Sequence, residues 1–139
     1  MPDGVEWREL PSLLAEADLV SIHAGRYAAE RALVGRQELA LMKRGSCLVN
    51  TARGVLVDET ALYDALSAGQ LAGAALDVFE GEPYTGPLAA LPNVLCTPHL
   101  GYCEQNTYES YYGTAVDQII AYGGGKPINI ANPDVVKGW

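Results

Sequence analysis

The sequence predicts an α/β fold in which a parallel β-sheet carries polar residues at the carboxyl ends of its strands. Short apolar runs alternate with segments whose apolar residues repeat at helical spacing. Three successive apolar runs also end in polar turns, and these turns carry Arg53, Glu82 and His99. Open parallel sheets bind ligands at the carboxyl ends of their strands. We therefore expect the three side chains to converge on one cleft.

The expected elements follow the chain in alternation. The expected helices cover 10–17, 35–43, 58–68 and 103–122, and the expected strands cover 18–23, 47–49, 73–79 and 93–96. Asp58 is a typical helix-capping residue, and Gly69 suits the left-handed position that closes a helix. Residues 24–27 are expected as a loop. Because the strands are apolar throughout, we expect helices on both faces of the sheet.

Right-handed crossovers would make this sheet a doubly wound, Rossmann-like layer. The residues that follow its strands would then lie along one rim: His23, Arg53, Asp77, Glu82 and His99. The layer is expected to be incomplete, because no Gly-x-Gly-x-x-Gly phosphate loop occurs in the sequence. Gly54, directly after Arg53, is interpreted as a point of backbone freedom. The apolar stripe of the last helix is interpreted as a packing face.

Composition narrows the possible partners. A net charge of -8 argues against nucleic acid or an anionic membrane surface, since both would repel the chain. No apolar stretch approaches the roughly 18 residues of a membrane span, and the first residues lack a signal pattern, so we expect a cytoplasmic protein. The three cysteines and two histidines lack metal-ligand spacing, so no metal is expected. A reactive role stays open only for Cys103.

Three motifs resemble a known family. They are Val49-Asn50-Thr51-Ala52-Arg53-Gly54, the block from Gly73 through Asp77-Val78-Phe79-Glu80-Gly81-Glu82 to Pro83, and Thr97-Pro98-His99-Leu100-Gly101. In this order and spacing they resemble the signature blocks of the D-isomer-specific 2-hydroxyacid dehydrogenases, which include D-3-phosphoglycerate dehydrogenase. The resemblance implies that Arg53 binds the substrate carboxylate, that His99 is the acid/base, and that Glu82 pairs with His99.

The resemblance also implies an NAD site, with NADP not excluded, and hydride transfer between the nicotinamide and a 2-hydroxy or 2-oxo acid such as 3-phosphoglycerate. The implied cofactor contacts are His23, Ala24, Thr51, Ala52, Arg53, Asp77, His99 and Gly101. Residues 1–125 then form a partial NAD-binding domain and residues 126–139 a tail. The residue types suit this chemistry, since arginine grips a carboxylate with two prongs and histidine donates a proton near neutral pH. Taken singly, each residue also has an ordinary interpretation: Arg53 as part of a surface ion pair, Glu82 as a solvated loop acid and His99 as a polar residue at a helix start.

Two hypotheses follow from the missing phosphate loop. In the first, the chain is part of an NAD-dependent dehydrogenase and is inactive alone, binding NADH only weakly. In the second, it is a non-catalytic module for self-association or partner binding. Either way a homo-oligomer is expected, because the strand at 18–23 would leave an uncovered sheet edge. The interface would include that edge or the last helix. The identity of the 2-hydroxy acid stays open.

Overall fold

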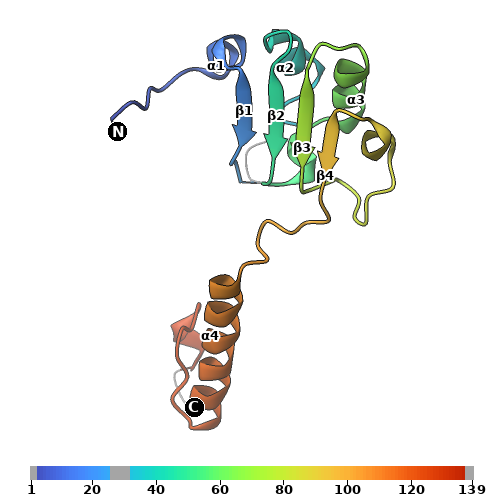
Figure 1. Ribbon diagram of the computed structural model, residues 1–139. Helices are drawn as coiled ribbons and strands as arrows, with labels where there is room; N and C mark the ends of the chain where they lie inside the picture. Colours follow the sequence, from blue (N-terminus) through green and yellow to red (C-terminus); the bar gives the residue numbers. More distant parts are fainter. Residues whose placement is uncertain (1–2, 26–31, 137–139) are drawn as a thin grey trace. The chain divides into compact units, whose positions relative to one another are not determined.

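The computed structural model describes residues 3–25 and 32–136 (Figure 1). It divides into two compact units, residues 1–100 and residues 101–139. The first unit holds the sheet and the second a long helix with the tail. The expected loop at 24–27 leaves the described residues after Gly25, and the tail leaves them after Val136.

The order of elements agrees with the expected alternation. The first unit contains α1 (Leu10–Glu16), β1 (Leu19–Ile22), α2 (Arg36–Leu41), β2 (Cys47–Asn50), the 3₁₀ helix η2 (Gly54–Leu56), α3 (Glu59–Ser67), β3 (Gly73–Leu76), the 3₁₀ helix η3 (Pro87–Ala90) and β4 (Val94–Cys96). The second contains α4 (Gln105–Gly123) and the 3₁₀ helix η4 (Pro133–Val136). The strand expected to reach Phe79 ends at Leu76. Beyond it, the Phe79 N–H donates to the Glu82 carboxylate rather than to a neighbouring strand.

The sheet has the order β1-β2-β3-β4, with every neighbouring pair parallel. Its last residues are aligned, since Ile22 pairs with Asn50, Asn50 with Leu76, and Leu76 with Cys96. The four strands therefore end together, as the lower edge of the sheet in Figure 1 shows. This edge is the rim that the sequence predicts, and the candidate site is built on it.

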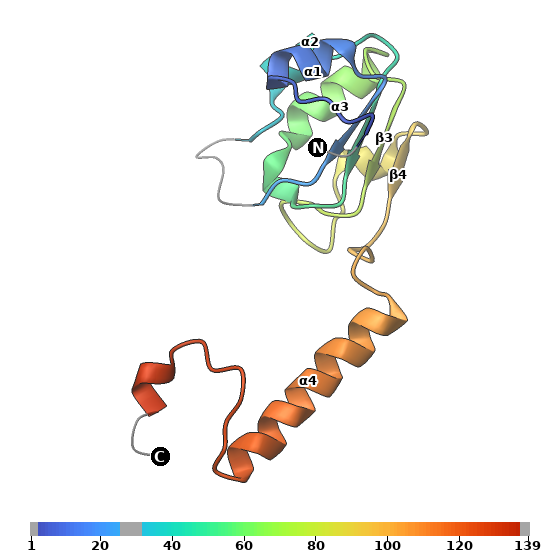
Figure 2. The ribbon, with the colours of Figure 1, turned by 90° about the vertical axis from the view of Figure 1, so that its left-hand side faces the viewer.

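The helices of this unit cover one face of the sheet. Helices α1, α2 and α3 pack in a row, and Figure 2 shows them on the same side of the strands. Along β1, β2 and β3, buried residues alternate with more exposed ones, and Leu19 and Leu95 on the strands are 59% and 64% exposed. The expectation of helices on both faces is therefore not met among the described residues of this unit. The physical reason is topological: when each right-handed crossover leads to the next strand in the same direction, every crossover helix falls on the same face.

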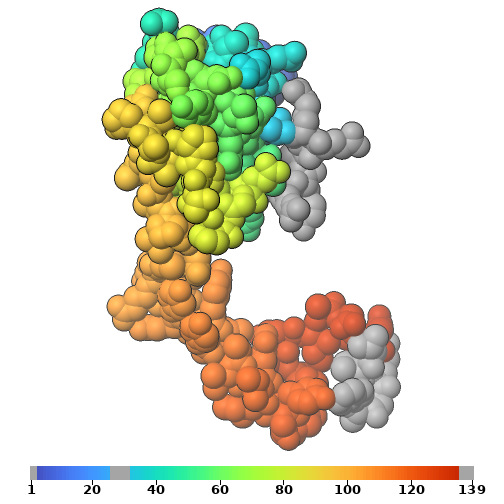
Figure 3. Space-filling model, turned by 90° about the vertical axis from the view of Figure 1, so that its right-hand side faces the viewer, coloured from blue at the N-terminus to red at the C-terminus, as the bar shows by residue number. Residues whose placement is uncertain are grey.

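Local signals set the bounds of α3. The Asp58 carboxylate accepts a hydrogen bond from the Ala61 N–H at 2.9 Å, which confirms the predicted cap. Gly69 follows the helix with a φ of +64°, the left-handed conformation predicted for it. The inward face of α3 joins a core of fully buried leucines: Leu14, Leu39, Leu48, Leu56, Leu62, Leu71 and Leu88. On the face shown in Figure 3, the green residues of α3 and the yellow residues around η3 lie against one another.

The second unit is organised around α4. Glu104 caps it, accepting hydrogen bonds from the N–H groups of Asn106 and Thr107, and these bonds lower the pKa of the Glu104 carboxyl. The sequence predicts that this helix begins at Cys103. The cap explains why it begins at Gln105 instead. No residue of α4 is buried within the described structure. The predicted packing role of its apolar stripe is therefore not fulfilled inside this unit.

Candidate active site at the carboxyl edge of the sheet

The central contact of the candidate site is an ion pair between two of the predicted residues. Nδ1 of His99 lies 2.9 Å from Oε2 of Glu82. The other carboxylate oxygen of Glu82 accepts the Phe79 N–H at 3.0 Å. These two hydrogen bonds, that of His99 first, lower the pKa of Glu82. The carboxylate is thus held charged and oriented beside the imidazole, which is 40% exposed and open to a ligand.

Asp77 fixes the loop that carries His99. Its side chain is buried, and Oδ1 accepts hydrogen bonds from the Thr97 hydroxyl and from the Leu100 N–H, the latter at 2.8 Å. The loop is thus tied down on both sides of His99. His99 has a φ of 57°, a left-handed conformation that non-glycine residues seldom adopt and that the surrounding structure must impose. Asp77 is therefore a positioning residue for the histidine.

Asn50 shapes the turn that presents Arg53. Its side chain is 1% exposed, donates from Nδ2 to the Arg53 carbonyl at 2.9 Å, and accepts the Ala52 N–H at 3.1 Å. Sequence reasoning missed this role, although an asparagine that ends an apolar strand is a typical residue for bonding its own turn. The Arg53 guanidinium donates to the Ala52 carbonyl at 2.6 Å. The hydrogen bond to its own turn therefore holds the Arg53 side chain at the rim.

Gly54 joins the arginine turn to the loop that carries Glu82. A Cβ on Gly54 would lie 1.9 Å from the Phe79 carbonyl carbon and 2.4 Å from the Glu80 nitrogen. Gly54 is not among the glycines with positive φ. Its interpretation as a point of backbone freedom is therefore wrong: the glycine is needed because the two backbones touch. This contact places Arg53 and Glu82 on the same part of the rim.

Of the remaining predicted cofactor residues, those of the first unit follow β1 and β2 at the same edge. His23 follows β1, and its Nε2 lies 2.8 Å from the Ser21 hydroxyl, a contact the sequence did not indicate. Ala24 and Ala52 are half-buried and Thr51 is exposed. Gly101 belongs to the second unit.

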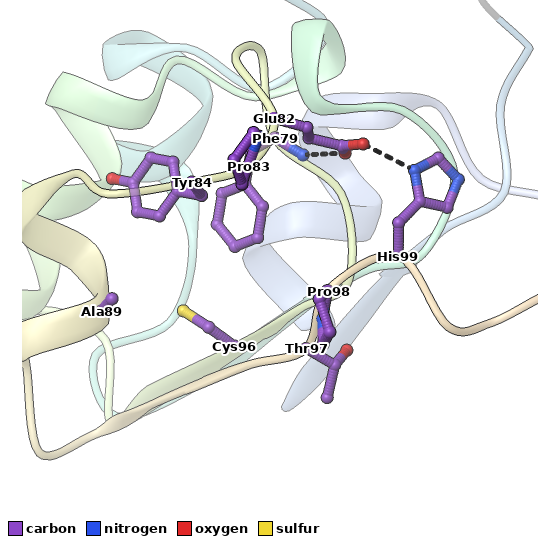
Figure 4. A pocket seen from close by; sticks show the side chains of 9 residues that line it. All are labelled: Phe79, Glu82, Pro83, Tyr84, Ala89, Cys96, Thr97, Pro98 and His99. Atoms are coloured by element: carbon purple, nitrogen blue, oxygen red, sulfur yellow. Dashed lines mark hydrogen bonds and ion pairs between the residues drawn. The ribbon is translucent and has the colours of Figure 1, made fainter.

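A pocket of about 320 Å³ adjoins the ion pair. Figure 4 shows its lining: Phe79, Glu82, Pro83, Tyr84, Ala89, Cys96, Thr97, Pro98 and His99. The rings of Phe79 and Tyr84 stack with centroids 4.1 Å apart, and burial raises the pKa of the Cys96 thiol. The His99 nitrogen that does not face Glu82 points away from the other labelled residues (Figure 4). The pocket is thus on the carboxylate side of the imidazole.

Neither a metal site nor a membrane span is found among residues 3–25 and 32–136. No three His, Cys, Asp or Glu side chains gather there as ligands for an ion. No helix in the same residues is long and apolar enough to cross a bilayer.

Comparison with known proteins identifies the first unit. A sequence model described as "D-isomer specific 2-hydroxyacid dehydrogenase, NAD binding domain" matches residues 2–101. The chain belongs to this family. The resemblance predicted from the three motifs is thus confirmed, as is the Rossmann-like sheet.

Relatives of this dehydrogenase family match nearly all of the chain. Glyoxylate reductase from Aeropyrum pernix is 44% identical over 137 residues, which are 96% of this chain and 41% of the relative. D-3-phosphoglycerate dehydrogenase from Escherichia coli K12 is 39% identical, covering 96% of this chain and 34% of the relative. A crystal structure of the TT0316 protein from Thermus thermophilus gives a TM-score of 0.83 at 42% identity, covering 93% of this chain and 42% of that one. The chain therefore spans about two fifths of these proteins.

The family's cofactor fits only part of the described structure. The aligned strand ends form the edge at which open α/β sheets bind their ligands. A pyrophosphate is normally bound by free N–H groups at a helix amino terminus. In α2, α3 and α4 one or two of these N–H groups are bonded to a protein carboxylate, that of Glu38, Asp58 or Glu104. A protein carboxylate therefore already occupies the amino end of each of these three helices.

Proposed function

We propose that the chain is the part of an NAD-dependent D-2-hydroxyacid dehydrogenase that carries the acid/base pair and the carboxylate-binding arginine. The observation that supports this most directly is the 2.9 Å contact between Glu82 and His99 on the rim of the family's NAD-binding domain. Arg53 shares that rim through the contact of Gly54 with Phe79. The reaction is hydride transfer between nicotinamide and a 2-hydroxy or 2-oxo acid.

Each residue has a separate role in this proposal. The Arg53 fork binds the substrate carboxylate and thereby orients the neighbouring carbonyl. The His99 nitrogen that faces away from Glu82 donates a proton to the carbonyl oxygen, while the Glu82 carboxylate stabilises the imidazolium through Nδ1. The bound cofactor supplies the hydride. We assign Thr51, Ala52 and Asp77 to the nicotinamide end of the cofactor.

The second part of the proposal is that this chain alone binds NADH weakly and does not turn over substrate. Its support is the absence of a Gly-x-Gly-x-x-Gly loop from the sequence and the carboxylate caps at three helix ends. We expect a dissociation constant on the order of millimolar or weaker by calorimetry, since the sequence has no Gly-rich loop to bind the pyrophosphate. Micromolar binding would contradict this. NADPH, measured in parallel, tests which of the two nicotinamide cofactors is bound more tightly.

A chimera tests the catalytic roles. The segment of Aeropyrum pernix glyoxylate reductase that matches this chain is replaced by this chain, and NADH oxidation is followed with glyoxylate and larger 2-oxo acids. His99→Ala should lower kcat by about 10²-fold or more with little effect on cofactor binding. Arg53→Ala should lower kcat/KM more than kcat, and Arg53→Lys should restore only part of the loss, because a point charge lacks the fork. Full activity in all three variants would refute the assignment.

A matched pair of carboxylates provides the control in that chimera. Glu82 bonds His99, whereas Glu80, two positions earlier, is an exposed residue of the same loop. Glu82→Gln should lower kcat and change its pH profile, because the imidazolium loses its anionic neighbour. Glu80→Gln should leave both unchanged. Equal effects of the two variants would show that general loop damage, rather than the ion pair, is being measured.

A further inference from the structure

The loop that carries Glu82 is hydrogen-bonded to the first residue of α3. The Glu59 carboxylate accepts a hydrogen bond from the Glu80 N–H at 2.8 Å. Glu59 is half-buried, whereas Glu80 is exposed. Two residues after Glu80, the Glu82 carboxylate accepts the Phe79 N–H and faces His99. The bond from Glu59 therefore lies at the base of the turn that presents one member of the ion pair.

Gly54 provides a second contact between the same two segments. Its backbone lies so close to the loop that a Cβ there would be 1.9 Å from the Phe79 carbonyl carbon and 2.4 Å from the Glu80 nitrogen. The Glu59 carboxylate bonds that same nitrogen. A contact at one point leaves two segments free to pivot, whereas contacts at two points prevent this movement. Because Arg53 directly precedes Gly54, the two contacts together set the position of the loop relative to the arginine.

The segment that joins Gly54 to Glu59 is anchored independently of the loop. The Leu56 carbonyl accepts the Val34 N–H at 2.9 Å, and the Asp58 N–H donates to the Val34 carbonyl at 3.0 Å. Leu56 and Val34 are each 1% exposed. Glu59 thus extends from a fixed base, and its carboxylate holds the loop rather than following it.

A glutamate suits both the first turn of α3 and the loop. Negative charge is favourable near the amino terminus of a helix, and a hydrogen bond to an ionised acceptor is shorter and stronger than one to a neutral acceptor. The exposed Glu80 N–H could bond water instead, so the hydrogen bond from Glu59 contributes more to the position of the loop than to the stability of the fold. Its loss should therefore be detected at the ion pair before it is detected in unfolding.

We propose that Glu59 is a positioning residue for the acid/base pair. Its hydrogen bond to the Glu80 N–H holds the loop so that the Glu82 carboxylate stays against Nδ1 of His99. Glu59 acts through the backbone of the loop, not through its charge. The catalytic consequence rests on the proposed function, whereas the structural consequence can be measured on the chain alone.

The pKa of the Glu82 carboxyl reports whether the loop is held, and carbon-13 NMR of the full chain measures it. The hydrogen bonds from His99 and from the Phe79 N–H lower this pKa. Glu59→Ala should weaken both bonds, so that the pKa of Glu82 rises toward its ordinary value. Removal of a nearby negative charge has the opposite effect, because it favours the remaining carboxylate. A rise is therefore specific to a looser loop.

Two variants serve as controls in the same titration. Glu59→Gln removes the charge but keeps a side-chain oxygen for the Glu80 N–H, so the pKa of Glu82 should remain lowered. Asp64→Ala removes a carboxylate from the same helix, where it forms an exposed ion pair with Arg36, and should also leave that pKa unchanged. An unchanged pKa in Glu59→Ala, or an equal rise in Glu59→Gln, would overturn the proposal. So would unfolding of Glu59→Ala, detected by circular dichroism, because the bond would then belong to the fold as a whole.

The chimera with Aeropyrum pernix glyoxylate reductase measures the catalytic consequence. Glu59→Ala should lower kcat about tenfold, and Glu59→Gln should restore most of the loss. In a double-mutant cycle, Glu59→Ala should lower the kcat of the Glu82→Ala variant by no more than about twofold, because Glu59 acts through Glu82. Additive losses would overturn the proposal. If Glu82→Ala leaves kcat unchanged, the proposed function fails, and the pKa of Glu82 in the chain alone still decides whether Glu59 positions it.

Discussion

Replacement of Gly54 by alanine tests how the two halves of the candidate site are joined. The added Cβ would lie 1.9 Å from the carbonyl carbon of Phe79, 2.3 Å from its oxygen and 2.4 Å from the Glu80 nitrogen. Real Cβ atoms essentially never approach below 3.0 Å, so one backbone segment must move by at least 1.1 Å. All three contacts are with backbone, so no side chain can rotate away. We expect a loss of unfolding free energy of about 3 kcal/mol or more, at the upper end for overpacking.

Urea unfolding followed by far-UV circular dichroism measures this loss on the chain itself. Gly81→Ala is the control, because Gly81 lies in the neighbouring loop and a Cβ there meets nothing within 4 Å. Its stability should stay within about 1 kcal/mol of the original. If Gly54→Ala unfolds at the same urea concentration as Gly81→Ala, the close approach is absent in solution. Arg53 would then not be held beside the Glu82 loop by this contact.

The remaining predictions concern single hydrogen bonds in the first unit, each measured by the same urea unfolding. Asp58→Ala removes the cap on α3 and should cost about 1 kcal/mol, whereas Asp58→Asn should retain most of it. Asn50→Asp keeps the shape but loses the donor to the Arg53 carbonyl, and should cost about 3 kcal/mol because the group is buried. Glu82 has a lowered pKa when folded, so its contribution to stability is present above its unfolded pKa and is lost as pH falls through the folded value. The stability difference from Glu82→Gln should therefore shrink on acidification from about pH 6 to pH 2, and a constant difference would contradict the assigned cause.

The features that could be predicted from the sequence are those whose physics is local. Asp58 and Gly69 mark the two ends of α3 through short-range hydrogen bonding and backbone conformation, and both predictions are confirmed. Contacts between distant segments were accessible only through family motifs. The pairing of Glu82 with His99 followed from the resemblance. Asn50 is an exception among the local features, because its bonds to its own turn were not predicted although an asparagine at a strand end is typical of them. Gly54 was misinterpreted because a sequence shows that a Cβ is missing but not what occupies its place.

The placement of the helices on one face of the sheet is a second feature that the sequence did not predict. Strand residues on both faces are apolar, which predicted helices on both sides, yet Leu19 and Leu95 are mostly exposed on the face opposite α1, α2 and α3. The hydrophobic pattern of the strands shows that a face of the sheet is suited to pack against apolar side chains. The direction of successive crossovers decides whether a helix lies on that face. Here all crossovers run in one direction, from β1 to β4, so only one face is covered within the unit. A pattern of residues cannot reveal that direction, because reversing the strand order leaves every local period unchanged.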